Sequence, residues 1–180
     1  SCYNGKSFTN YYVKNGLGNN TVFNVFKDKS GAIWFGTNGG GATRFDGKNF
    51  ATITTSQGLA ANIVRTGLAL DNGIIVFGTN GGGASFYNPV KKDSTAFTNS
   101  STSSGLAYLE VSCVIEDKTG NLWLGTEGGG LSILKNYKST FSRPVFLIYI
   151  TAHGLAGITV WCMAQDYVCL LWVCGLGGVS

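Results

Sequence analysis

Residues 28–41 read DKSGAIWFGTNGGG, and this stretch returns along the chain. Residues 117–130 read DKTGNLWLGTEGGG, residues 71–83 read DNGIIVFGTNGGG, and a more divergent copy at residues 166–178 reads DYVCLLWVCGLGG. Each copy follows a Gly-Leu pair, and the pairs begin at Gly16, Gly58, Gly105 and Gly154. A period of 42 to 49 residues indicates an architecture built from repeated supersecondary units.

Each copy contains four predicted β-strands, which in the first copy are residues 22–27, 32–37, 42–45 and 50–54. The stretch 28–31 is a turn, because Asp28 caps the backbone and Gly31 accepts a positive φ. Asp46-Gly47 is a hairpin signal between the last two strands. Four antiparallel strands in a repeat of this length predict a β-propeller blade. One blade cannot bury its apolar face alone, so we expect Trp34 and its equivalents to pack against the next blade.

The fold class predicted is therefore all-β, a single β-propeller domain over residues 1–180. Its blade repeats are residues 16–57, 58–104, 105–153, and 154–180 completed by 1–15. Residues 3–8 match residues 45–50, so the chain starts late in a blade. We expect four four-stranded blades, with the ring closed by pairing the N-terminal strand with the C-terminal blade. Two chains forming an eight-bladed ring, or an open stack, would use the same edges.

The repeated string also resembles a known family. G-L-x-x-N-x-V, followed by D-x-x-G-x-x-W-x-G-T, G-G-G and F-D-G-K-x-F, is similar to the two-component regulator propeller repeat. The resemblance is strong in the first and third copies, whereas Val76 replaces the Trp in the second and Cys174-Gly175-Leu176 replaces Gly-Thr-x in the fourth. It implies blades from the extracytoplasmic sensor part of histidine-kinase receptors. Nothing in the chain resembles a kinase, so the signalling role is not carried over.

Composition indicates where the protein works. Charged residues make up 12% of the chain, the net charge is +4, and the Lys and Arg residues are scattered, so no nucleic-acid partner is expected. Low charge and the glycosylation sequons at Asn19 and Asn99 fit an extracellular or periplasmic protein, read as a mature chain after leader removal. Residues 145–164 are long and apolar enough for a membrane helix, but Gly154 keeps the repeat register, and we expect strands there.

Titratable groups that would support catalysis are scarce. His153 is the one histidine, and no triad or metal-ligand set accompanies it. We expect no enzyme activity, no metal and no cofactor. A propeller lyase that uses His153 is the remaining enzymatic alternative.

Ligand-binding candidates come from the turns. The loops before Gly-Leu and the Gly-Gly-Gly turns should emerge on one face, which gathers Asn38, Asn80 and Glu127, with Tyr108 near the rim. Amides and an aromatic ring around a channel favour a glycan or a peptide. The predicted function is a binding or recognition module for a glycan or protein ligand. The alternative is a self-assembling structural subunit of an extracellular filament or surface layer, because low charge and exposed strand edges favour association with copies of itself.

The repeat register also predicts a disulfide. Cys2 corresponds to Arg44 and Cys174 to Gly36, positions that face each other across one hairpin. We expect a Cys2–Cys174 bond across the seam. The rival pairing is Cys113 with Cys162, and the fifth cysteine, Cys169, would stay free.

Overall fold

The computed structural model describes residues 1–135, 137 and 144–180, and it is built from antiparallel strands joined by tight turns. The first blade contains β3 (Val22–Lys27), β4 (Ile33–Thr37), β5 (Ala42–Phe45) and β6 (Phe50–Ile53). The second contains β7 (Val64–Ala69), β8 (Ile75–Thr79), β9 (Ala84–Tyr87) and β10 (Phe97–Ser100). The third contains β11 (Val111–Glu116), β12 (Leu122–Thr126), β13 (Gly130–Leu134) and β14 (Phe146–Tyr149). The fourth contains β15 (Val160–Gln165), β16 (Leu171–Gly175) and β17 (Gly178–Val179).

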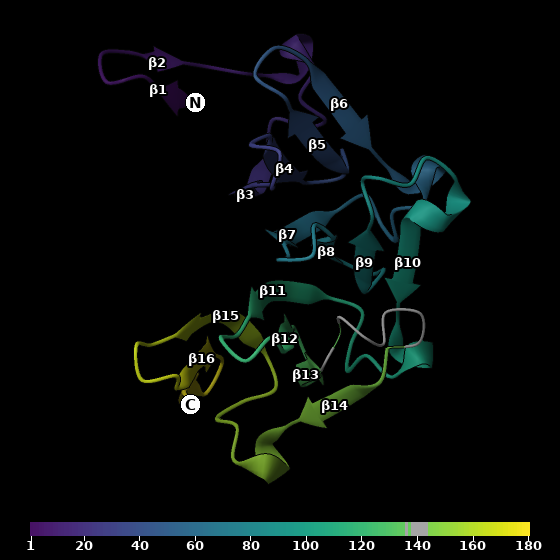
Figure 1. Ribbon diagram of the computed structural model, residues 1–180. Helices are drawn as coiled ribbons and strands as arrows, with labels where there is room; N and C mark the ends of the chain where they lie inside the picture. Colours follow the sequence, from purple (N-terminus) through teal and green to yellow (C-terminus); the bar gives the residue numbers. More distant parts are fainter. Residues whose placement is uncertain (136, 138–143) are drawn as a thin grey trace.

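The sheets follow one another along an open arc, with the first strand of each blade on its inner side (Figure 1). The inner strands lie next to one another in the order β3, β7, β11, β15. A separate hairpin of β1 (Cys2–Tyr3) and β2 (Phe8–Thr9) precedes the first blade. The first three blades have the four antiparallel strands that the repeat predicted, and the described part of the fourth has three.

The Gly-Leu pairs have a structural cause. Short 3-10 turns, η1 (Val13–Asn15), η2 (Thr55–Gln57), η4 (Thr102–Ser104) and η5 (Thr151–His153), each end at the glycine of a pair, and one more, η3 (Ser94–Ala96), lies before β10. These four glycines have φ between 92° and 112°, a region that a side chain disfavours. The leucine that follows is buried in the first three copies. The pair therefore reverses the chain and places an apolar anchor under the blade.

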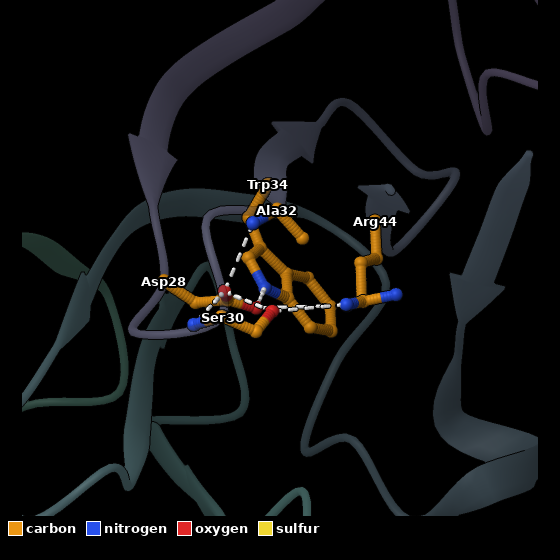
Figure 2. A network of polar contacts seen from close by, with 5 residues as sticks. All are labelled: Asp28, Ser30, Ala32, Trp34 and Arg44. Carbon is orange, nitrogen blue, oxygen red and sulfur yellow. Dashed lines mark hydrogen bonds and ion pairs between the residues drawn. The ribbon is translucent and has the colours of Figure 1, made fainter. Parts of the chain in front are cut away.

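The Asp-x-x-Gly turn is locked to the strand that follows it. In the first blade, Asp28 accepts hydrogen bonds from the main-chain N–H groups of Ser30 and Ala32 and from the indole of Trp34 at 2.8 Å (Figure 2). Arg44 from β5 reaches the same carboxylate at 3.5 Å and the Ser30 hydroxyl at 3.1 Å. One aspartate thus holds the turn, the indole ring and the third strand together.

Apolar side chains pack between blades, as expected. Trp34 is 1% exposed and lies against Phe77 and Tyr87 of the second blade, with ring centroids 5.4 and 6.1 Å apart. Val76, which replaces the tryptophan in the second copy, is fully buried against the third blade. Trp123 is half-buried between the third and fourth blades. The predicted burial of Trp34 is confirmed.

Ring closure within the chain is not confirmed. β1 pairs with β2, and β17 pairs with β16, so in the described sheets the N-terminal strand does not join the C-terminal blade. The chain ends lie apart at the two ends of the arc (Figure 1).

The predicted Cys2–Cys174 disulfide is wrong. Cys174 is bonded to Cys162, its direct partner across β15 and β16, with Cα atoms 5.4 Å apart. Cys2 and Cys169 are exposed free thiols, and Cys113, the rival partner, is a free thiol too. Burial raises the pKa of Cys113 to about 11, so this thiol stays protonated at neutral pH.

The apolar stretch 145–164 forms β14, η5 and the start of β15. Among the described residues, no helix has the length and apolar character that a membrane crossing requires.

Candidate ligand-binding surface

The inner strand of every blade contains a bulge at the same place. The register shifts between Val22 and Asn24, between Val64 and Thr66, between Val111 and Cys113, and between Val160 and Cys162. The extra residues are Phe23, Arg65, Ser112 and Trp161. A bulge residue is left out of the ladder and re-aims its side chain, and bulges are frequent next to functional sites.

The bulges lie at the same edge of the blades as the glycine turns. Val22 pairs with Thr37, and Val64 and Val111 pair with the equivalent threonines of their own blades. The residues that follow these threonines open the turns 38–41, 80–83 and 127–130. We call this side of the molecule the Gly-turn edge.

Arg65 connects three blades at this edge. Arg65 on β7 bonds through Nη2 to Oε1 of Glu127, which opens the third glycine turn. The same guanidinium lies over the ring of Phe23 on β3, 5.3 Å from its centroid. The stacked and paired guanidinium therefore has a fixed position, as a cation held between an aromatic face and a carboxylate.

Two exposed aromatic rings flank this pair along the series of inner strands. The side chains of Phe23 and Trp161 are exposed to 42% and 52%. Ser112, at the same position in the third blade, is half-buried, and its hydroxyl lies within hydrogen-bonding distance of the main-chain carbonyls of Gly125 and Val160, which share its one proton. The Gly-turn edge thus combines aromatic faces at its two ends with a charged pair between them.

The four sequence-predicted ligand candidates do lie at the Gly-turn edge. Asn38, Asn80 and Glu127 hold equivalent positions, and each donates its main-chain N–H to the carbonyl of Thr21, Ile63 and Glu110 respectively. Tyr108 is exposed and its ring lies beside Gly128. Glu127 is brought together with Arg65, whereas Asn38 is exposed and Asn80 is partly exposed.

Sequence reasoning missed Phe23, Arg65 and Trp161. Strict alternation along a strand would place them on a blade face, and the bulge moves them out of that alternation. A signal was present: each follows the valine that opens an inner strand, at the same position in its repeat.

The remaining residues singled out from the sequence are the two sequon asparagines and His153, and the side chain of each makes a hydrogen bond. Asn99 donates its side-chain nitrogen to the Gly58 carbonyl at 3.0 Å, so the atom that would carry a glycan is occupied. The side-chain oxygen of Asn19 accepts the N–H of Thr21 at 2.8 Å. The imidazole Nδ1 of His153 accepts the N–H of Ile150 at 3.2 Å, which fits a capping role at η5.

A hollow lies elsewhere, on the outer side between the first and second blades. It has a volume of about 710 Å³, and its lining includes Gln57, Tyr87, Lys91 and Phe97. Burial raises the pKa of Tyr87. In the described part of the chain, no group of three His, Cys, Asp or Glu side chains is placed to hold a metal ion.

Comparison with known sequences supports the repeat assignment. The profile described as two component regulator propeller matches residues 16–39 and 105–128, which are the start of the first and third copies. These are the copies in which the resemblance was strongest. No curated protein sequence matches the chain.

Three solved structures share this fold. One is the extracellular domain of the putative hybrid two component system BT3049 from B. thetaiotaomicron, with a TM-score of 0.81 and 21% identity over 96% of this chain and 23% of that one. Another is the extracellular domain of BT4673 from the same organism, a putative one component system, with a TM-score of 0.73 and 22% identity over 91% and 23% of the two chains.

A third is PorZ of Porphyromonas gingivalis, described as an essential surface component of the type-IX secretion system, with a TM-score of 0.65 and 16% identity over 96% and 27% of the two chains. The present chain spans about a quarter of each of these solved chains. The similarities establish that its blades follow the propeller fold.

Proposed function

We propose that this chain, whose first and third repeats match the two component regulator propeller profile, is an extracytoplasmic binding module that holds a glycan at its Gly-turn edge. The observation that carries the proposal is the common bulge, which presents Phe23, Arg65 and Trp161 at that edge. The module acts by recognition and performs no chemical step.

The side chains suit a sugar. Exposed aromatic rings such as Phe23 and Trp161 offer flat apolar faces, against which the C–H face of a sugar ring packs. Hydroxyl groups need donors and acceptors around such a platform, and the amides of Asn38 and Asn80 supply both. Binding sites in general combine apolar surface with a few fixed polar groups, and this edge has that composition.

The Arg65–Glu127 pair supports recognition in preference to catalysis. Each charge satisfies the other, and the guanidinium is also covered by Phe23. A general base needs a lone pair available to the substrate, and this carboxylate is committed to its partner. The pair therefore serves as a fixed donor and acceptor set.

An extracytoplasmic location is supported by two observations. The solved BT3049 and BT4673 structures are extracellular domains. The Cys162–Cys174 disulfide suits an oxidising compartment.

The test is a glycan-array screen followed by calorimetry on the oligosaccharide that binds. Trp161→Ala and Phe23→Ala should each weaken binding about fivefold or more, because one stacked ring contributes on the order of 1 kcal/mol or more. Tyr167→Ala is the matched control, since Tyr167 is an exposed aromatic on the Asp166 turn, away from the bulges, and its loss should leave affinity unchanged. Equal effects of all three variants, or retention of a peptide instead of a sugar, would reject the glycan assignment.

A further inference from the structure

The connection between β9 and β10 is longer than its counterpart in the first blade. Residues 88–96 join these two strands, whereas residues 46–49 join β5 and β6. Both connections close with the same main-chain bond, from the N–H of the first residue to the carbonyl of the last, at 2.8 Å in the second blade and 3.2 Å in the first. The five additional residues are therefore not needed to reverse the chain, and loops on a rigid scaffold are where binding residues concentrate.

This longer connection forms one wall of the hollow between the first and second blades. The opposite wall consists of η2 and the end of β6, and Figure 1 shows these segments beside the connection that leads into β10. Tyr87 and Phe97, the residues on either side of the connection, line the hollow with ring centroids 4.7 Å apart. The volume of about 710 Å³ is within the range of small-molecule binding sites.

The same place in the first blade has a smaller hollow. Its lining includes Phe45 and Phe50, which hold the repeat positions of Tyr87 and Phe97, and its volume is about 440 Å³. The longer connection of the second blade therefore enlarges a hollow that the repeat itself produces.

The positive charge of the enlarged hollow comes from the added residues. Lys91 and Lys92 both line it, and neither makes an ion pair with a described residue. Among the described residues of the lining, Asp93 is the one acidic group, and its carboxylate caps η3 by accepting the N–H and the hydroxyl of Thr95 at 2.8 and 2.6 Å. The lining thus carries one net positive charge, and its two ammonium groups are available to an anion.

Two uncharged groups of the lining offer further donors. The hydroxyl of Tyr87 makes no hydrogen bond to a described residue, and burial raises the pKa of this phenol, so it keeps its proton at neutral pH. The side-chain oxygen of Gln57 accepts from Thr54, which leaves its amide nitrogen as a donor. Donors without matching acceptors favour a ligand that only accepts hydrogen bonds, as a carboxylate does.

The rest of the lining favours an apolar ligand body. Ile53, Ala96 and Phe97 contribute apolar surface, and aromatic rings pack well against other flat rings. The hydroxyl groups of a sugar need acceptors as well as donors, and the carboxylate of Asp93 and the amide oxygen of Gln57 already have partners. This hollow therefore differs in chemistry from the Gly-turn edge.

We propose that this hollow is a second binding site, which takes a small aromatic carboxylic acid. The carboxylate lies between the ammonium groups of Lys91 and Lys92 and accepts a hydrogen bond from Tyr87. The aromatic body packs against Phe97 and Ile53. The site shares no residue with the Gly-turn edge, so the proposal does not rest on glycan binding there.

The test is titration of the 180-residue chain with three small molecules, followed by heteronuclear NMR. Naphthylacetate has both the rings and the charge, naphthylacetamide keeps the rings without the charge, and glucuronate keeps the carboxylate on a sugar. Naphthylacetate should shift the amide resonances of residues 53–58 and 87–97 and bind at least about tenfold more tightly than the other two. Equal binding of the amide would show that charge plays no part, and equal or tighter binding of glucuronate would reject the aromatic acid. Either result overturns the proposal.

Single substitutions assign the contacts. Lys91→Gln and Lys92→Gln should each weaken naphthylacetate binding about threefold, and the double variant about tenfold, because each removes one exposed ion pair. Tyr87→Phe keeps the ring, removes one hydrogen bond and should also weaken binding about threefold. Lys48→Gln, in the smaller hollow of the first blade, is the matched control and should leave the affinity unchanged. The resonances of other residues report in the same spectra whether each variant is folded.

The longer connection can also be removed. Replacing residues 88–96 with the sequence D-G-K-N of residues 46–49 keeps a hairpin that the first blade already forms, and the shifts caused by naphthylacetate should disappear. A shortened chain or a Lys91→Gln/Lys92→Gln double variant that binds as tightly as the parent would overturn the proposal, as would shifts confined to the Gly-turn edge. None of these changes touches Phe23 or Trp161, so the glycan proposal can fail while this one holds.

Discussion

The indole nitrogen of Trp123 donates a hydrogen bond of 2.7 Å to Oδ2 of Asp117, six residues before it. The same bond joins Trp34 to Asp28 and Trp172 to Asp166. The spacing of Asp and Trp in the repeat therefore records a contact between a turn and the strand that follows it. In the second copy, Val76 has no such donor and fills the position with apolar contact alone.

These bonds make stability depend on pH in the acid range. Partial burial acts to raise the pKa of Asp117, but hydrogen bonds from Trp123, Asn121 and Thr119 outweigh it and lower the pKa to about 2. A carboxyl with a folded pKa below its unfolded value stabilises the fold above the unfolded pKa, and the contribution is lost as pH falls through the folded value. We expect the free energy of unfolding to fall between about pH 4 and pH 2, measured by urea denaturation.

Asp117→Asn removes the titrating group and should flatten this acid dependence. At neutral pH it should cost about 1 kcal/mol, because a charge-assisted bond to the indole is replaced by a neutral one. Glu110→Gln controls for the loss of one negative charge. An unchanged acid slope in Asp117→Asn would mean that Asp117 is not the responsible carboxylate.

Trp34 and Trp172 form a matched pair of equivalent residues with opposite burial. Trp34→Ala should cost about 3–5 kcal/mol, because the ring is enclosed between two blades. Trp172→Ala should cost about 1 kcal/mol or less, since half of this residue already faces water. Guanidinium denaturation of both variants gives the comparison, and similar losses would show that the exposed indole is covered in solution.

Cys169 occupies a glycine position. Its φ is 72°, the one positive value among described non-glycine residues, and the equivalent Gly31, Gly73 and Gly120 have φ between 80° and 87°. Cys169→Gly should raise the free energy of unfolding by about 0.5 kcal/mol, because relief of the left-handed strain exceeds the entropy cost of glycine. The converse change, Gly120→Cys, should lower it by about 1 kcal/mol. A loss of stability in Cys169→Gly would contradict the assigned backbone.

The Cys162–Cys174 bond should be measurable as a redox contribution to stability. Replacing both residues with alanine should cost about 2–3 kcal/mol on loop-entropy grounds. A thiol reductant should destabilise the parent chain by a similar amount and leave the double variant unaffected. Peptide mapping under non-reducing conditions should find Cys162 and Cys174 in one linked species. A Cys2–Cys174 link within one chain would instead support the disulfide that the sequence predicted.

Much of the fold could be predicted from the repeat, because each residue that defines the repeat has a local structural role. Gly16 requires a left-handed backbone, Asp28 caps its own turn, and Trp34 needs cover from a neighbouring blade. All of these follow from residue type and spacing within one copy. The four strands of the first three blades followed from them.

Residue type and spacing within one copy could not predict contacts between the chain ends. Matching Cys2 to Arg44 and Cys174 to Gly36 identifies equivalent positions but does not say whether one chain brings them together. In the structure, Cys162 lies directly opposite Cys174 on adjacent strands, and this short-range partner takes the bond. The bulge at Arg65 was missed for a related reason: sequence alternation does not register a residue that the ladder leaves out.

Each glycine turn joins its blade to the next through main-chain atoms alone. The N–H groups of Gly41, Gly83 and Gly130 donate to the carbonyls of Asn62, Leu109 and Ile158 at 2.8, 2.8 and 2.7 Å. A hydrogen bond between main-chain atoms does not depend on the side chain of either residue. Mutations can therefore accumulate around this joint, as in the divergent fourth copy, while the spacing of neighbouring blades is inherited unchanged. New surface specificities can evolve on such a scaffold one turn at a time.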